Sequence, residues 1–155
     1  DTFSSRGLGD VYKRQSIASL KKFKGVKRRM DLVADILNIK VYDDFAHHPT
    51  AIKMSSNSIK DKYPTKKILG IVELGSNTMS SGYHKDNLIE SLKILDKTLL
   101  LDINNAYDYL NGFDSEEKML DCIRTEILEY DIILIMTNKD SQKFIKPILD
   151  SLENK

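Results

Sequence analysis

The chain has 155 residues, of which 41% are hydrophobic and 30% charged, and its formal net charge is +1. This size and composition predict one soluble globular domain with its own core. The small net charge excludes a global field for nucleic acid, and no apolar run approaches the roughly 18 residues of a membrane span. A lone cysteine, Cys122, excludes an internal disulfide, favours a reducing cytoplasm and is expected to be structural.

The first residues show no periodic apolar face. We expect Asp1–Gln15 to pack on nothing and exclude this segment from the fold. Asp10–Gln15 resembles a translated sequencing adapter, and a polar, disordered tail rich in Ser and Gly is the alternative. A short helix end is expected at Ser16–Lys22, where Gly25 would break it.

A hairpin and a helix are predicted next. Arg28–Leu37 and Ile39–Asp44 have the pattern of two strands, with Asn38 in a tight turn. Pro49–Lys62 is predicted to be a helix, because proline suits the first helical position and apolar residues recur on one face.

Strands alternate with helices in the rest of the chain. Continuous apolar runs predict buried, neighbouring parallel strands at Ile68–Leu74, Thr98–Ile103 and Asp131–Thr137. Helices are predicted at Asp86–Lys97, at Ser115–Tyr130 with Ser115 as the cap, and in a last segment ending near Leu152. Pro147 predicts that this last helix starts near Lys146 or kinks there. The alternation predicts an α/β fold, mostly parallel, with helices on both faces of the sheet.

The segment Tyr42–Ile52 carries the strongest functional signal, because two carboxylates and two imidazoles lie where a strand becomes a helix. Its string Asp-Asp-Phe-Ala-His-His-Pro-Thr-Ala-Ile, preceded by Gly-Val-Lys-Arg-Arg, resembles the start of the C-terminal domain of Mur ligases. The later string Ser-Asn-Thr-Met at 76–79 also resembles a family element. The resemblance implies a Rossmann-like three-layer domain at residues 29–155, with the end of a central domain and a linker at 16–28.

The resemblance also implies an activity. It points to the members that use ATP to join a murein tripeptide to UDP-N-acetylmuramate in peptidoglycan recycling. The member that joins L-alanine is the alternative, and a degenerate binding module without catalysis is another. No G-x-x-x-x-G-K-[ST] phosphate loop occurs in this chain. In the family that loop and the Mg²⁺ ligands belong to the central domain, so this chain alone is expected to be inactive.

Four residues near the motif are candidates for binding nucleotide. The resemblance places Arg29 at the linker arginine that reaches the ATP γ-phosphate, and Asp44 at the ribose. The alternatives are a solvated basic run for Arg29 and a turn or capping carboxylate for Asp44. Asp43 is expected to point to the other face of the strand. His47 and His48 could bind nucleotide or orient the reacting groups, or cap the helix, and are not expected to bind metal. Arg29 and His48 are the catalytic candidates.

Ser76, Asn77 and Thr78 are the candidates for binding the peptide. The family pattern has Glu-Pro-Arg before these residues, whereas this chain has Glu73-Leu74-Gly75. The family pattern also has a turn rich in glycine after the last main strand, whereas this chain has Thr-Asn-Lys-Asp-Ser at 137–141. Both departures concern the choice of substrate.

Overall fold

The computed structural model describes residues 27–75, 81, 85–107 and 110–155. The expectations for Asp1–Gln15, for Ser16–Lys22 and for Ser76–Thr78 lie outside these residues. The strands are β1 (Asp31–Ile36), β2 (Ile39–Asp44), β3 (Ile68–Glu73), β4 (Lys97–Leu101) and β5 (Ile132–Met136). The helices are α2 (Pro49–Lys62), α4 (Lys85–Leu92), α5 (Glu116–Glu126), the 3₁₀ turn η2 (Ile127–Glu129) and α6 (Gln142–Glu153).

The five strands form one sheet in the order β1-β2-β5-β3-β4. The pairs β2–β5, β5–β3 and β3–β4 are parallel, so the prediction that the three apolar runs are neighbouring parallel strands is confirmed. Their carboxyl ends therefore lie at the same edge of the sheet, which is where open α/β sheets build ligand sites. Every residue of β3 and β5 is buried, as expected for strands that are covered on both faces.

The predicted hairpin is also confirmed. β1 pairs antiparallel with β2, and Ile36 is opposite Ile39, so the loop has only two residues. Leu37 and Asn38 both have positive φ, 53° and 63°, as a type I′ turn requires. Asparagine tolerates this conformation better than leucine does, which is why Asn38 alone carried the signal in the sequence.

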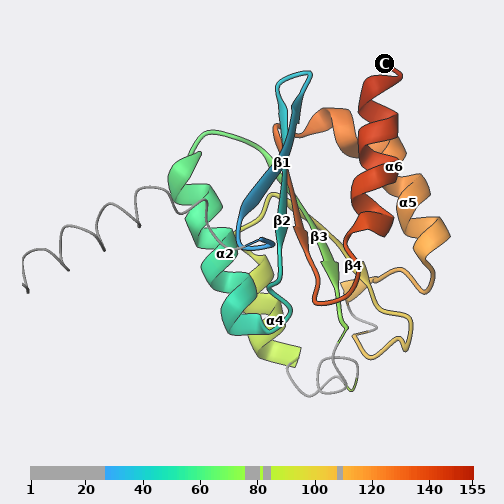
Figure 1. Cartoon of the computed structure of the whole chain (residues 1–155). Coiled ribbons are helices and arrows are strands. Elements are labelled where there is room, and N and C mark those ends of the chain that lie inside the picture. The colour runs from blue at the N-terminus through green and yellow to red at the C-terminus, as the bar shows by residue number, and fades with distance from the viewer. Residues whose placement is uncertain (1–26, 76–80, 82–84, 108–109) are drawn as a thin grey trace, which may run out of the picture.

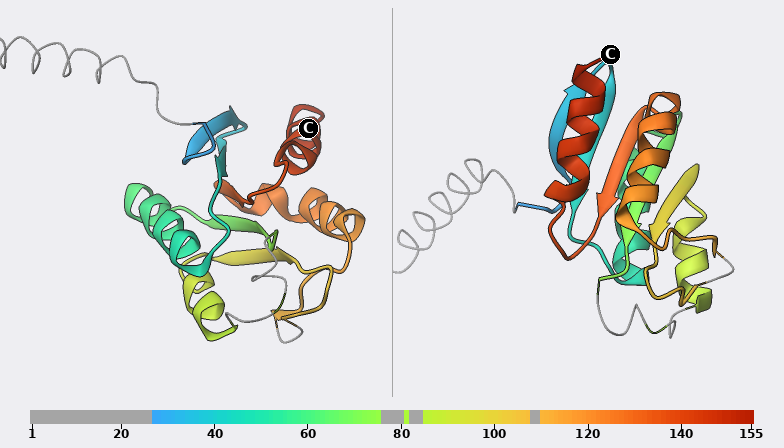
Figure 2. Two further views of the ribbon diagram at one scale, coloured as in Figure 1. Left: turned by 60° about the horizontal axis from the view of Figure 1, so that its bottom comes forward. Right: turned by 90° about the vertical axis from the view of Figure 1, so that its right-hand side faces the viewer.

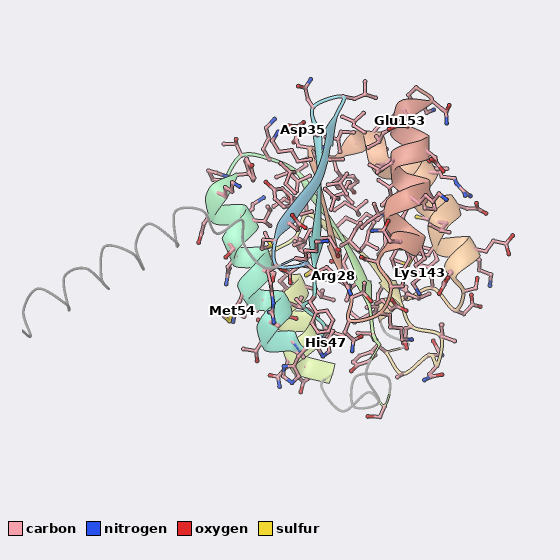
Figure 3. All side chains as sticks on the ribbon, viewed as in Figure 1. Arg28, Asp35, His47, Met54, Lys143 and Glu153 are labelled. Carbon is pink, nitrogen blue, oxygen red and sulfur yellow. The ribbon has the colours of Figure 1, made fainter. Side chains whose placement is uncertain are left out.

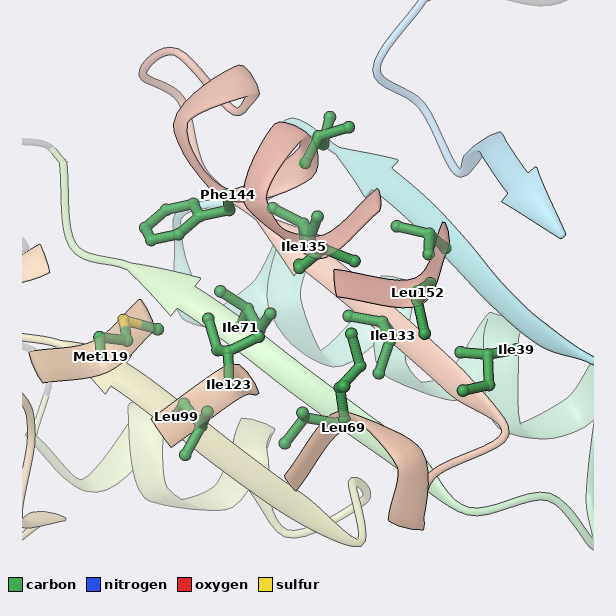
Figure 4. Packing of buried hydrophobic residues seen from close by; sticks show 14 of the residues in the cluster. Ile39, Leu69, Ile71, Leu99, Met119, Ile123, Ile133, Ile135, Phe144 and Leu152 are labelled. Carbon is green, nitrogen blue, oxygen red and sulfur yellow. The ribbon is translucent and has the colours of Figure 1, made fainter. Parts of the chain in front are cut away.

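Helices cover both faces of the sheet, so the three-layer architecture is confirmed. α2 and α4 lie on one face, and α5 and α6 lie on the other (Figures 1 and 2). The second face buries a cluster of aliphatic side chains with Met119 and Phe144 (Figure 4). The first face buries a cluster that includes Ile52, Ile59 and Leu88. None of the helices in the described ranges is long and apolar enough to cross a membrane.

Helix α2 begins at Pro49 and ends at Lys62, as predicted. The predicted cap of α5 is confirmed as well, because the Ser115 side chain accepts a hydrogen bond from the Lys118 N–H. The prediction that the helix continues to Tyr130 is wrong in part, since α5 ends at Glu126 and a 3₁₀ turn follows.

Two other helix boundaries and some strand boundaries differ from the predictions. The first strand begins at Asp31 instead of Arg28, because residues 27–30 form a turn in which Arg28 and Met30 have positive φ. The last helix begins at Gln142, before Pro147, because the apolar stripe already starts at Phe144 and burial outweighs the one hydrogen bond that proline removes. The helix predicted at Asp86–Lys97 ends at Leu92, because β4 already begins at Lys97. That strand ends at Leu101, and Ile103 is exposed.

Hydrogen bonds of Asp96 connect the turn between α4 and β4 to the start of β3. Its Oδ2 accepts hydrogen bonds from the Ile68 N–H at 2.9 Å and from Lys60 Nζ at 3.1 Å. Partial burial alone would raise the pKa of Asp96, but these two donors outweigh it and lower the pKa below its ordinary 3.8. A lowered pKa means that Asp96 stabilises the fold above about pH 4 and loses this effect as the pH falls through the pKa of the folded state.

We therefore expect Asp96→Asn to lower the free energy of unfolding by about 1 kcal/mol at pH 7. Below pH about 3 the difference from the wild type should vanish, because the carboxyl group is then protonated. Urea unfolding at several pH values measures this. Asp121→Asn, which changes an exposed carboxylate paired with Arg124, is the control. An equal loss at all pH values would contradict the role of the Asp96 charge.

Candidate functional site

Buried polar side chains follow the apolar residues at the carboxyl edge of the sheet. β2 ends in Asp43 and Asp44, β3 ends in Glu73, and Asp102 and Thr137 directly follow β4 and β5; all five are buried. Arg28, His47 and Lys143 lie toward this end of the molecule, and Asp35 and Glu153 toward the other (Figure 3). The strands therefore gather charged and polar groups at one edge.

Asp44 organises the turn that links β2 to α2. Its Oδ1 accepts hydrogen bonds from the Ala46 N–H at 2.8 Å and from Ser55 Oγ at 3.0 Å. Its Oδ2 accepts one from the Met30 N–H at 2.8 Å. The side chain is buried. These are the contacts of a turn carboxylate, and they fix the segment before β1, the turn after β2 and helix α2 relative to one another.

The two histidines lie side by side at the start of α2. His48 is the N-cap, and its Nδ1 accepts a hydrogen bond from the Thr50 N–H at 3.4 Å. His47 Nδ1 lies 2.9 Å from the Phe45 carbonyl oxygen, and its ring meets the Phe45 ring edge to face. His48 is exposed and His47 is half-buried. Asp44, His47 and His48 are thus brought together at the end of β2, as expected.

Asp43 points to the opposite face of the sheet, as the strand alternation predicts. Its Oδ2 accepts a hydrogen bond from Ser141 Oγ at 2.8 Å, at the start of α6, whereas Asp44 contacts α2. The same oxygen lies 3.3 Å from Arg28 Nε. Asp43 thereby joins the segment before β1 to the start of α6.

Arg28 connects the segment before β1 to the carboxyl edge of the sheet. Its Nη2 donates to the Thr137 carbonyl oxygen at 2.6 Å, and its guanidinium lies 5.2 Å from the centre of the Phe45 ring. Its own carbonyl oxygen accepts from the Phe45 N–H at 2.8 Å. Arg28 and Met30 have positive φ, 57° and 50°, a conformation that costs about 1 kcal/mol per residue. The contacts of Arg28 and Asp44 offset this strain.

Arg29, between these two residues, is exposed. The structure therefore separates two adjacent arginines: Arg28 turns toward the sheet edge, and Arg29 faces solvent. The composition of the basic run could not distinguish them, and only the resemblance to the family singled out Arg29.

A second cluster at the edge was missed by the sequence reasoning. Glu73 Oε1 lies 2.7 Å from Lys143 Nζ and 3.5 Å from Lys139 Nζ, and its Oε2 accepts from Thr137 Oγ1 at 2.6 Å. Lys143 also pairs with Glu116. Glu73, a charged residue at the end of the otherwise apolar run of β3, was the signal by which the sequence could have revealed this cluster.

Lys143 is the central cation of this cluster. Burial alone would lower the pKa of Lys143, but the carboxylates of Glu116 and Glu73 outweigh burial and raise it above its ordinary 10.5. Lys143 is therefore charged at neutral pH, and its stabilising effect would be lost only as the pH rises through the raised pKa.

A cavity of about 290 Å³ opens beside this cluster, between the ends of β3 and β4. Glu73, Gly75, Asp102 and Lys139 are among its lining residues. Asp102 supports one wall, because its Oδ2 accepts a hydrogen bond from the Tyr107 N–H at 2.7 Å. The cavity is large enough for a small polar group. Ser76, Asn77 and Thr78, the peptide-binding candidates, follow directly in the sequence but lie outside the described residues.

Cys122 lies away from this edge, on α5. It is half-buried, its Sγ donates to Glu126 Oε1 at 3.4 Å, and burial raises the pKa of its thiol. A raised pKa disfavours the thiolate, so Cys122 has the character of a structural residue.

A mostly parallel sheet with polar groups gathered at its carboxyl edge defines a Rossmann-like α/β domain. Residues 28–139 match the family model described as "Mur ligase, glutamate ligase domain". The chain belongs to the Mur ligase family.

Two relatives and one solved structure define the similarity. The chain is 33% identical over 151 residues to a UDP-N-acetylmuramate–L-alanyl-γ-D-glutamyl-meso-2,6-diaminoheptandioate ligase of Haemophilus influenzae, covering 88% of this chain and 33% of that one. It is 36% identical over 105 residues to a UDP-N-acetylmuramate–L-alanine ligase of Aquifex aeolicus, covering 64% and 22%. It matches the crystal structure of a murein peptide ligase from Psychrobacter arcticus with a TM-score of 0.73 and 33% identity, covering 89% and 32%. The chain thus spans about a third or less of the length of each.

Proposed function

We propose that this chain is the C-terminal domain of an ATP-dependent ligase that joins a murein tripeptide to UDP-N-acetylmuramate. The main support is the similarity to the Haemophilus tripeptide ligase, which extends over 88% of this chain. The polar carboxyl edge supports a ligand site in the same domain. Residues 16–28 would be the end of the central domain and the linker, and residues 29–155 the C-terminal domain. An enzyme that consumes ATP would work in the cytoplasm.

The proposed reaction has two steps. ATP transfers its γ-phosphoryl group to the carboxylate of UDP-N-acetylmuramate, which gives an acyl phosphate and ADP. The peptide amine then attacks the acyl carbon, and an amide forms as inorganic phosphate leaves. Such chemistry depends on positioning and charge neutralisation, because the reacting groups are all anionic. Mg²⁺ would be held by the central domain of the complete ligase, so the residues of this domain would act on the phosphates and on the peptide.

Arg29 is proposed to neutralise the γ-phosphate. A guanidinium stays charged and binds phosphate oxygens bidentately, and Arg29 is exposed beside a linker that Arg28 and Asp44 hold in place. His47 and His48 are proposed to contact the nucleotide, since both lie at the N-terminus of α2, where a helix favours anions. Ser76, Asn77 and Thr78 are proposed to face the peptide.

The alternative with a specific observation behind it is the L-alanine ligase, because the Aquifex relative has the higher identity, although over a shorter stretch. A degenerate, non-catalytic module is the second alternative. The complete protein is given UDP-N-acetylmuramate and ATP, together with either the tripeptide or L-alanine, and the release of ADP is measured. This measurement distinguishes the tripeptide ligase, the L-alanine ligase and the non-catalytic module. We expect joining with the tripeptide. Preference for L-alanine, or no release with either, would reject the proposal in favour of the respective alternative.

Asp44 is proposed to hold the ATP ribose, and its contacts make this role testable. We expect Asp44→Ala in the complete ligase to raise the KM for ATP about tenfold with little change in kcat, because ribose contacts are alike in the ground and transition states. The same change should also destabilise the turn by about 2 kcal/mol.

Ser55→Ala separates these two effects. It removes one hydrogen bond to Asp44 and leaves the carboxylate in place. We expect this variant to lose about 1 kcal/mol of stability and to keep the wild-type KM for ATP. Steady-state kinetics and urea unfolding measure both quantities. An unchanged KM in Asp44→Ala would leave Asp44 as a turn carboxylate only.

A further inference from the structure

Arg29 lies between two residues whose backbone is strained. Arg28 and Met30 have positive φ, 57° and 50°. Residues with long side chains rarely adopt this left-handed conformation, and it persists in proteins only where surrounding contacts enforce it. Residues 27–30 belong to no helix or strand, so secondary structure does not supply those contacts. Other hydrogen bonds and ion pairs of Arg28 and Met30 must hold the turn.

The backbone on both sides of Arg29 is fixed by hydrogen bonds to the turn after β2. The Arg28 carbonyl oxygen accepts from the Phe45 N–H at 2.8 Å, and the Met30 N–H donates to Asp44 Oδ2 at 2.8 Å. The side chain of Arg29 is exposed. The domain therefore holds the backbone before and after Arg29 and leaves its guanidinium in solvent.

The side chain of Arg28 adds an attachment to the neighbouring strand. Its Nη2 donates at 2.6 Å to the carbonyl oxygen of Thr137, which directly follows β5, and its Nε lies 3.3 Å from Asp43 Oδ2. The guanidinium also lies 5.2 Å from the centre of the Phe45 ring. The side chain of Arg28 is 29% exposed, and that of Asp43 is 5% exposed. The Arg28 guanidinium is thus engaged by the protein itself, unlike that of Arg29.

We propose that Arg28 is a positioning residue, which holds the backbone of Arg29 so that the Arg29 guanidinium is directed at the γ-phosphate. The target of Arg29 rests on the proposed function, whereas the hold on its backbone rests on the contacts of Arg28. A charge that stabilises a transition state is most effective when it is already in place before the reaction. Without the contacts of Arg28, the strained residues would relax and Arg29 would lose its fixed direction.

A double-mutant cycle in the complete ligase tests this dependence. We expect Arg28→Met to lower kcat about tenfold and to change the KM for ATP by less than about threefold, because a displaced Arg29 loses most of its effect in the transition state. In an Arg29→Ala background, Arg28→Met should change kcat by less than about twofold, since no guanidinium is left to position. Arg124→Met, which removes an exposed arginine paired with Asp121, is the control and should keep the wild-type kcat.

A second variant separates positioning from stability. Arg28→Met leaves the buried Asp43 carboxylate without its cation, so this variant should also unfold at a lower urea concentration. Arg28→Met, Asp43→Asn removes the uncompensated charge and keeps a hydrogen-bonding side chain beside Ser141. We expect the double variant to regain most of the lost urea midpoint and none of the lost kcat. A residue with a structural role alone would regain both.

Amide hydrogen exchange of the chain measures the hold on the backbone without catalysis. The Phe45 and Met30 N–H groups donate the two hydrogen bonds beside Arg29, so their exchange reports opening of the turn. Both should exchange about tenfold faster in Arg28→Met, Asp43→Asn than in the wild type, because the strained turn opens more often. The amides that pair β3 with β5 should keep their rates.

The outcomes separate this inference from the proposed function. An unchanged kcat in Arg28→Met, an equal loss with and without Arg29, or a kcat that recovers together with the urea midpoint would overturn the positioning role. If the complete ligase joined nothing, the proposed function would fail and the exchange rates would decide. Faster exchange at Phe45 and Met30 would then support the hold of Arg28 on residue 29, and unchanged exchange would overturn it.

Discussion

Lys143→Met should lower the free energy of unfolding by about 3 kcal/mol, because it leaves a buried carboxylate without its main counter-ion. Glu73 is only 2% exposed, and Lys143 Nζ is its closest cation, at 2.7 Å. Methionine keeps most of the volume of the lysine stem, so lost packing contributes little. Lys139, at 3.5 Å, compensates only in part.

Urea unfolding of the chain at pH 7 measures this loss. Lys118→Met is the matched control, because Lys118 pairs with Asp114 on the surface and should change stability by less than about 0.5 kcal/mol. The double variant Glu73→Gln, Lys143→Met removes the uncompensated charge and keeps a hydrogen-bonding side chain beside Thr137. It should be more stable than Lys143→Met alone. A double variant that is no more stable would show that the Glu73 charge is not the cause.

Arg29→Ala in the complete ligase should lower kcat about a hundredfold, because a charge directed at the γ-phosphate acts most strongly as negative charge builds in the transition state. The KM for ATP should change less. The folding stability should stay near the wild type, since Arg29 is exposed and the segment before β1 is held by the contacts of Arg28.

Steady-state kinetics at saturating substrates measures this effect. Arg124→Ala, which removes an exposed arginine paired with Asp121 on α5, is the control and should keep the wild-type kcat. If Arg29→Ala kept the wild-type kcat as well, Arg29 would belong to a solvated basic run, and the role carried over from the family would be wrong.

Much of the fold followed from local patterns in the sequence. The apolar runs marked all three strands correctly, and β3 and β5 are buried throughout as the runs predicted, whereas β4 lies at the edge of the sheet and is only partly buried. Asn38 marked the hairpin, because few residues tolerate its backbone conformation. Pro49 marked the first residue of α2.

Other features depend on tertiary contacts and had no local signal. α6 begins before Pro147 because the side chains of Phe144 and Ile145 are buried against the sheet. α4 stops at Leu92 because the chain must enter β4 at Lys97, opposite Leu69 of β3. Both boundaries reflect packing that overrides local preference.

The candidate site was predictable only where its residues are adjacent in sequence. Asp44, His47 and His48 lie in one motif, and the structure keeps them together. The pair of Glu73 and Lys143 joins residues 70 positions apart, because β5 inserts between β2 and β3 in the sheet. No local sequence pattern determines the strand order. The cluster of Glu73 and Lys143 and the cavity beside it could therefore be found only in the structure.

The transfer of oxygen from the substrate carboxylate to phosphate tests the central claim most directly. The complete ligase is given UDP-N-acetylmuramate with ¹⁸O in its carboxylate, together with ATP and tripeptide, and the inorganic phosphate is analysed by mass spectrometry. An acyl phosphate requires that one carboxylate oxygen leaves with the phosphate, so the account predicts one ¹⁸O atom in each phosphate released by joining. Unlabelled phosphate, or label found in AMP instead, would contradict it.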